Sequence, residues 1–170
     1  METWDAIRSR RNVREFTADP IPAADLDKVL EAARRTPSSR NWQPWDFVVV
    51  TERHRLERLA EVWRGAWHVA GAAAAIALVV PQPSEETRNW LHFDLGQATM
   101  SIMLAATGLG LGTAHAAVQD QALAREVLGF PADRFCAAVI SLGHPADRPL
   151  TPIVSPDRRQ FHEVVHRESW

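Results

Sequence analysis

The stretch from Pro37 to Val50 reads PSSRNWQPWDFVVV and carries the strongest structural signal in the chain. Its first part holds hydroxyls, amides and two prolines, which predicts a rigid loop. Residues 47–50 are apolar and mostly β-branched, which predicts a buried strand. Short polar side chains at the mouth of a buried strand suit the edge of a heteroaromatic ring. The alternative is a well-capped turn in which the tryptophans pack.

On both sides of this stretch, apolar residues recur at the spacing of helices and strands. We expect helices over residues 3–10, 25–34, 56–63, 87–109 and 121–128, the last closed by Gly129. Strands are expected over 47–50, 76–80, about 113–118 and 137–142. Four prolines, beginning with Pro145, precede Arg158, so the tail is expected to run extended over another surface. The pattern predicts one α+β domain over residues 1–170.

The segment 87–109 is the longest helical pattern in the chain. Leu91, Leu95, Ala98 and Ile102 form its apolar stripe, yet the second half is apolar on nearly every side. A helix of this kind is buried between layers or at a subunit interface.

Composition excludes several classes of protein. The 170 residues are 46% hydrophobic and 24% charged, with a net charge of −2, so bulk attraction to nucleic acid or to an anionic membrane is not expected. Prolines and polar residues interrupt both long uncharged stretches, so neither predicts a membrane span. We also expect no signal peptide, because the first residues lack an apolar region.

The single cysteine, Cys136, lies in an apolar run, which predicts a buried, unreactive thiol and fits a reducing cytoplasm.

Arginines are concentrated near the start of the chain, at positions 8, 10, 11 and 14. Guanidinium groups match phosphate oxygens in pairs, so this cluster suits an anion site. A solvated face is the alternative.

These elements together resemble the FMN-dependent nitroreductase family. The resemblance consists of Arg10-Arg11-x-x-Arg14, then PSSxNxQPWxFVVV, then a long central helix, GLGLGT at 108–113 and SLGHPADRP at 141–149. It covers essentially the whole chain. It implies a central, mostly antiparallel sheet flanked by helices, with the long helix at the interface of an intertwined homodimer that holds FMN. It also implies hydride transfer from NADH or NADPH through FMN to nitroaromatics, quinones or similar small acceptors by a ping-pong mechanism.

The resemblance also assigns roles by position. Arg10 and Arg11 would clamp the FMN phosphate and ribityl end, and Asn12 stands where the family usually has serine. Arg14 would be the catalytic residue, because a cation near N1 and O2 of the ring stabilises the anionic reduced flavin. The remaining cofactor contacts implied are Pro37, Ser38 and Ser39 from the partner subunit, Asn41 and Gln43 at the ring or ribityl chain, the backbone of Thr113 to His115 along the ring, and Arg158 and Arg159 over the phosphate.

Some of these residues have simpler explanations. His115 is equally a core histidine, and Arg158 and Arg159 equally belong to a solvated tail. The chain has little room between the second strand and the long helix for a segment that covers the substrate pocket. The identity of the substrate is therefore not carried over from the family, and Trp42 is a candidate to narrow the site.

Two further motifs suggest other chemistry. His162-Glu163-x-x-His166 fits the zinc protease pattern, but a third ligand would have to come from upstream. Solvated histidines around a buried valine pair are the preferred interpretation. GLGLGT follows a helix and not a strand, so a dinucleotide-binding turn is excluded. The alternatives to a flavin oxidoreductase are an FMN storage or sensor protein without turnover and, less favoured, a zinc hydrolase. No resident metal is expected.

Overall fold

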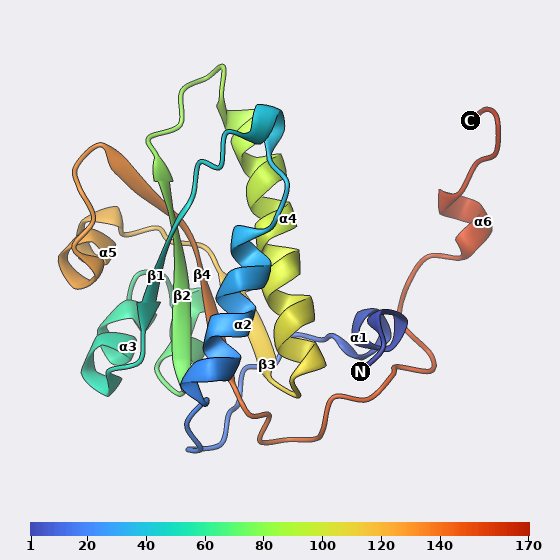
Figure 1. Cartoon of the computed structure of the whole chain (residues 1–170), viewed down its shortest axis with the longest axis horizontal. Helices are drawn as coiled ribbons and strands as arrows, with labels where there is room; N and C mark the ends of the chain where they lie inside the picture. Colours follow the sequence, from blue (N-terminus) through green and yellow to red (C-terminus); the bar gives the residue numbers. More distant parts are fainter.

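A computed structural model describes all residues, 1–170, and has a four-stranded sheet with helices on both faces (Figure 1). The strands run antiparallel in the order β1-β2-β4-β3. The α+β prediction is confirmed. The strands are β1 (Asp46–Val50), β2 (Ala74–Pro81), β3 (Gly112–Ala116) and β4 (Arg134–Gly143); the helices are α1 (Thr3–Ser9), α2 (Ala23–Arg34), α3 (Arg53–Ala60), α4 (Arg88–Gly108), α5 (Gln121–Leu128) and α6 (Phe161–Val164), with 3-10 turns η1 (Ser39–Asn41) and η2 (Arg64–Val69).

Strand β2 explains the layered arrangement. Every residue from Ala74 to Val80 is buried, because helices cover both faces of the sheet. Ile76, Leu78 and Val80 face a core shared with α2 and α4. The intervening residues Ala75, Ala77 and Val79 face a second core with α3, η2 and α5. The small side chains on that second face let the shorter elements pack close to the sheet.

The predicted elements exist, but several limits are wrong. Helix α3 covers Arg53–Ala60 and not residues 56–63, and β3 ends at Ala116. The turn η2 was not predicted, because its six residues, RGAWHV, show no clear helical or strand period. Helix α5 is as expected: the Asp120 carboxylate caps it by accepting from Leu123 N–H at 2.9 Å, and Gly129 closes it with a φ of 75°.

Helix α4 lies on one face of the sheet and is apolar on two sides (Figure 1). One side, with Leu91, Leu95 and Ile102, is buried against the sheet. The other side exposes Phe93 and Met100, which lie two turns apart on one face. No helix in the structure is long and apolar enough to cross a membrane. Cys136 is buried in β4, and burial raises the pKa of its thiol to about 12, as expected for an unreactive cysteine.

Candidate functional site

The arginine segment is placed by strand-like pairing with the start of β3. Asn12 forms a bridge with Thr113, and Val13 N–H donates to the Thr113 carbonyl at 2.9 Å. Side chains alternate along such a segment. Val13 is therefore buried, whereas Asn12 and Arg14 point outward on the same side.

Two glycines allow this segment to approach the sheet. A Cβ atom on Gly112 would lie 2.7 Å from the side chain of Val13, and one on Gly143 would lie 2.7 Å from the ring of Phe16. Real Cβ atoms essentially never approach so closely. Gly112 of GLGLGT and Gly143 of SLGHP thus act through packing: they let residues 13–16 lie close to the sheet, with Arg14 pointing outward.

Beside this segment lies a hollow of about 330 Å³. Arg11 is braced there, because it donates to Asp147 Oδ1 at 2.7 Å and to the Arg148 carbonyl at 2.9 Å. The Arg11 guanidinium in turn holds the pKa of Asp147 below its usual range. Arg10 and Arg14 form no ion pair or side-chain hydrogen bond, so their charges are free for a ligand. The lining residues are Arg11, Asn12, Arg14, Glu15, Trp67 and Asp147.

A buried histidine that the sequence did not suggest lies near these groups. His68, on η2, is 1% exposed, and its Nδ1 lies 2.8 Å from Ser141 Oγ. Ser141 donates its own hydrogen to the Ala114 carbonyl at 3.2 Å, so His68 is the donor to Ser141. Its Nε2 is then an acceptor, and it is buried without a partner. Burial, with smaller contributions from Arg14 and His115, lowers the pKa of His68 to about 4, so the ring is neutral near pH 7.

The loop after α2 is closed by its own hydrogen bonds. The backbone N–H of Gln43 donates to Ser38 Oγ at 2.8 Å, and the side-chain Nε2 of Gln43 donates to the Asn41 backbone carbonyl at 3.2 Å. Arg40, Asn41 and Gln43 have backbone φ values of 53°, 57° and 50°. These lie in the left-handed region, which residues other than glycine rarely adopt. The alternative of a capped turn is therefore met in its hydrogen bonds, but of its tryptophans only Trp45 is buried and Trp42 is exposed. The turn is also strained, as ligand-binding loops often are.

A second buried residue absent from the sequence reasoning holds this loop. Asp94, on α4, is fully buried and accepts the backbone N–H of Ser39 at 3.0 and 3.1 Å and its hydroxyl at 3.2 Å. A single acid within the apolar stripe between Leu91 and Leu95 was the available signal. The Ser39 hydroxyl hydrogen is thus directed toward α4.

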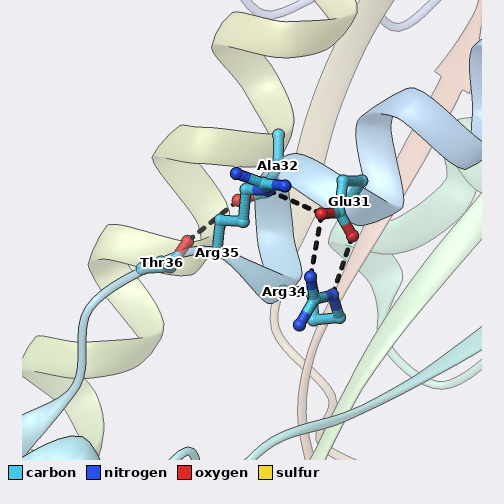
Figure 2. Close-up of polar contacts among 5 residues, drawn as sticks. All are labelled: Glu31, Ala32, Arg34, Arg35 and Thr36. Atoms are coloured by element: carbon cyan, nitrogen blue, oxygen red, sulfur yellow. Dashed lines mark hydrogen bonds and ion pairs between the residues drawn. The ribbon is translucent and has the colours of Figure 1, made fainter.

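The end of α2 fixes where the loop begins. Figure 2 shows Glu31 between Arg34 and Arg35, with the shortest contacts at 2.7 and 2.6 Å. These two hydrogen-bonded guanidinium groups lower the pKa of Glu31 to about 2. Thr36 Oγ1 donates to the Ala32 carbonyl at 3.3 Å, which closes the helix just before Pro37.

One chain does not bring all the predicted cofactor residues together. Ser39 is bound near the start of α4, whereas Asn12 pairs with Thr113 beyond its end. At a rise of 1.5 Å per residue, the helix between Asp94 and Gly108 spans about 20 Å. The loop and the arginine segment accordingly lie at opposite ends of α4 (Figure 1).

The tail stands apart from the sheet. Residues 154–170 are all exposed, and α6 lies away from the sheet and from α2 and α4 (Figure 1). The expected extended path is confirmed, but within this chain it crosses no other surface beyond Ile153, whose N–H donates to the Arg8 carbonyl at 3.0 Å. Arg158 and Arg159 bond only within the tail, to the Asp157 carbonyl and to Glu163.

Three expectations about single residues need correction or completion. His115 is exposed on β3, so its interpretation as a core histidine is wrong. Thr113 is buried, and its hydroxyl has no partner. Val164 and Val165 are exposed, not a buried pair, because α6 packs against nothing in this chain.

The His-Glu-x-x-His motif does not form a protease helix. Helix α6 ends at Val164, so His162 and His166 do not share one helical face. The Glu163 carboxylate accepts the backbone N–H of Gln160. The His166 ring stacks on Trp170, with the ring centroids 4.4 Å apart. No group of three or more His, Cys, Asp or Glu residues lies together in a way that could hold a metal ion.

Comparison with known proteins agrees with the resemblance seen in the sequence. A model of the Nitroreductase family matches residues 7–144. The chain is 33% identical over 174 residues to an Archaeoglobus fulgidus protein described as a candidate NADH dehydrogenase/NAD(P)H nitroreductase, covering 99% of both. It also resembles the crystal structure of NADPH:FMN oxidoreductase from Vibrio harveyi complexed with NAD+, with a TM-score of 0.84, 26% identity, and 99% of this chain and 77% of that one covered. A candidate NADH oxidase from Clostridium acetobutylicum gives a TM-score of 0.86 at 25% identity, covering 98% and 100%.

Proposed function

Because this chain belongs to the nitroreductase family, we propose that it is an FMN-dependent oxidoreductase. In this proposal it takes hydride from NADH or NADPH and passes the reducing equivalents to a small acceptor such as a nitroaromatic compound or a quinone. FMN and NAD(P)H are named for similar proteins, an FMN reductase of Bacillus subtilis and an NADPH-flavin oxidoreductase of Vibrio harveyi. The observation that carries the proposal is a polar hollow lined by the unpaired guanidinium group of Arg14 and by Arg11, with a second unpaired arginine, Arg10, beside Arg11 in the chain.

The donor set of this region fits the chemistry of FMN. A phosphate group requires cations and N–H donors, and the pyrimidine edge of a flavin presents carbonyl oxygens and ring nitrogens. Arg10 has no carboxylate competing for it, whereas Arg11 is already partly neutralised by Asp147. We assign Arg10 to the phosphate and Arg11 to bracing that end of the site.

Arg14 serves the ring in this proposal. FMN, when bound, supplies the two-electron chemistry that links nicotinamide and acceptor. Arg14 holds a permanent charge at the outward face of its segment, where it lowers the free energy of negative charge that develops beside it. His68 supports this field without adding a second cation, because its buried ring is neutral. Donor and acceptor use one pocket in turn, which is a ping-pong scheme.

We further propose that the site is completed in a homodimer. The loop residues Ser38 and Ser39 lie about 20 Å along α4 from the arginine segment, so they reach an FMN bound by a second copy. The exposed face of α4, with Phe93 and Met100, supplies an apolar surface for that copy. The exposed apolar residues of the tail, including Phe161 and Val165, supply another. A single, buried cysteine, Cys136, supports residence in a reducing cytoplasm.

The test is an absorbance spectrum of the purified protein, followed by addition of NADPH or NADH without oxygen. We expect a yellow protein with one FMN per chain that bleaches when the nicotinamide is added, and the faster donor identifies the preferred one. A yellow protein that neither donor bleaches would support a storage or sensor role and contradict the reductase. A colourless protein that free FMN does not reconstitute would contradict the cofactor assignment.

A further inference from the structure

A second and larger hollow lies at the opposite end of α4 from the arginine segment. It has a volume of about 670 Å³, within the usual range for small-molecule sites. The loop after α2 forms one wall and the start of α4, with the residues before it, forms the other. Its lining residues are Ser39, Arg40, Trp42, Glu86, Thr87 and Trp90.

Two tryptophans from different elements face this hollow. Trp42, on the loop, is 44% exposed, and Trp90, in the first turn of α4, is 62% exposed. Neither ring stacks on another aromatic side chain, in contrast to Trp45, which packs against Phe47. Large exposed aromatic surfaces that line a hollow are suited to a planar ligand, because stacking removes them from water.

The charged groups of the hollow are also unused. Arg40 and Glu86 form no ion pair and no side-chain hydrogen bond. In contrast, most charged residues on helices α2 and α3 have such partners. The hollow also includes Thr87, which precedes α4, so the positive end of a 21-residue helix lies at its edge. Arg40 and this helix end attract an anionic group, whereas the Glu86 carboxylate repels one, so a single anionic substituent is expected beside Arg40 and away from Glu86.

We propose that this hollow is the acceptor subsite and that it takes a planar aromatic compound bearing one anionic substituent. The ring lies against Trp42 and Trp90, and the anion is bound by Arg40. This inference rests on the proposed function, because Ser39 belongs both to the hollow and to the loop assigned to the FMN of the partner subunit. It identifies the side chains of this chain that select among acceptors.

The experiment measures ligand binding to the FMN-loaded, oxidised protein without nicotinamide. Dissociation constants for 4-nitrobenzoate and for its neutral isostere 4-nitrobenzamide are obtained from perturbation of the flavin absorbance band. We expect the anion to bind about tenfold more tightly, the range of one charge-assisted hydrogen bond. Arg40→Gln should remove this difference and leave the benzamide affinity unchanged. Trp42→Ala and Trp90→Ala should weaken both ligands about three- to tenfold, as expected for loss of aromatic stacking.

Matched variants separate this site from general effects. Arg88→Gln removes an exposed arginine outside the hollow, and Trp4→Ala removes an exposed tryptophan on α1; neither should change either affinity. Equal affinity for the two ligands in the unmodified protein, or equal effects of Arg40→Gln and Arg88→Gln, would overturn the proposal. So would tryptophan variants that alter the oligomeric state in gel filtration without altering affinity, because the hollow would then hold the partner subunit. Protein that bleaches with NADPH but shows no anion preference refutes this inference alone, whereas protein that binds no FMN refutes the proposed function.

Discussion

Asp94 binds Ser39 through both its carboxylate oxygens, taking the backbone N–H at 3.0 and 3.1 Å and the hydroxyl at 3.2 Å. Asp94 is fully buried on α4, so its charge is compensated only by these donors and by the surrounding dipoles. The contact ties the strained loop to α4, whose apolar side packs in the core. It therefore connects the packing of the core with the position of the residues proposed to meet FMN.

Removal of this carboxylate should destabilise the protein and loosen the loop. Asp94→Ala leaves the two Ser39 donors without their acceptor, and we expect a loss of about 1–3 kcal/mol in the free energy of unfolding. The affinity for FMN should fall as well. Chemical denaturation and FMN titration measure the two effects. Asp27→Ala, at an exposed position on α2, is the control; equal stability of both variants would contradict the anchoring role.

Arg10 and Arg14 should differ in their effects on the cofactor. We expect Arg10→Ala to lose FMN, because the phosphate loses its free cation, and Arg14→Ala to keep FMN but to be reduced more slowly. FMN occupancy and stopped-flow reduction by NADPH distinguish the two. Arg8→Ala, which removes an exposed arginine paired with Asp5 on α1, should change neither. Full FMN occupancy in Arg10→Ala would refute the phosphate assignment.

His68 should make stability depend on pH. Its pKa in the folded protein is about 4, below the ordinary 6.5, so between these values the unfolded state binds the extra proton. Stability therefore rises with pH across this window, by about 1.4 kcal/mol per unit and about 3 kcal/mol in all, and this dependence is absent above pH 6.5. Urea unfolding from pH 4 to 8, compared between the unmodified protein and His68→Gln, measures this slope. His92→Gln, at an exposed site on α4, should retain it; a slope that persists in His68→Gln would show that other groups cause it.

Gly112→Ala should disturb the arginine segment. The added Cβ would lie 2.7 Å from the Val13 side chain, and such overpacking typically destabilises by about 1–3 kcal/mol. A second change, Val13→Gly, removes all the opposing side-chain atoms, including the Val13 Cβ at 2.7 Å, and should recover part of the loss. Gly71→Ala meets nothing within 4 Å and is the matched control. Thermal unfolding of the three variants decides the matter, and equal midpoints for Gly112→Ala and Gly71→Ala would exclude the close contact.

Much of the fold could be predicted because it depends on local patterns. Three local patterns each predict one element: the FVVV run predicts a strand, the apolar stripe predicts the long helix, and Gly129 predicts the end of a helix. The structure has the corresponding β1, α4 and α5. Limits such as those of α3 and the turn η2 were missed, because tertiary packing of Trp63 and Ala66 and not local periodicity determines them. The exposure of Val164 and Val165 was missed for a similar reason: their pattern does not reveal whether a partner surface lies within the same chain.

The sequence by itself determined the family, the order of elements and the residue types available to an anionic, planar cofactor, since these follow from motifs and spacing. Only the tertiary structure decided which of those residues are free to act. It pairs Arg11 with Asp147 and leaves Arg10 and Arg14 unpaired, it buries Asp94 against Ser39, and it brings the neutral His68 toward Arg14. The reason is physical: the charge state and hydrogen-bond partners of a side chain depend on neighbours that are distant in sequence. Helix α4 likewise separates the two halves of the candidate site by about 20 Å, a consequence of its rise per residue that only the assembled fold makes visible.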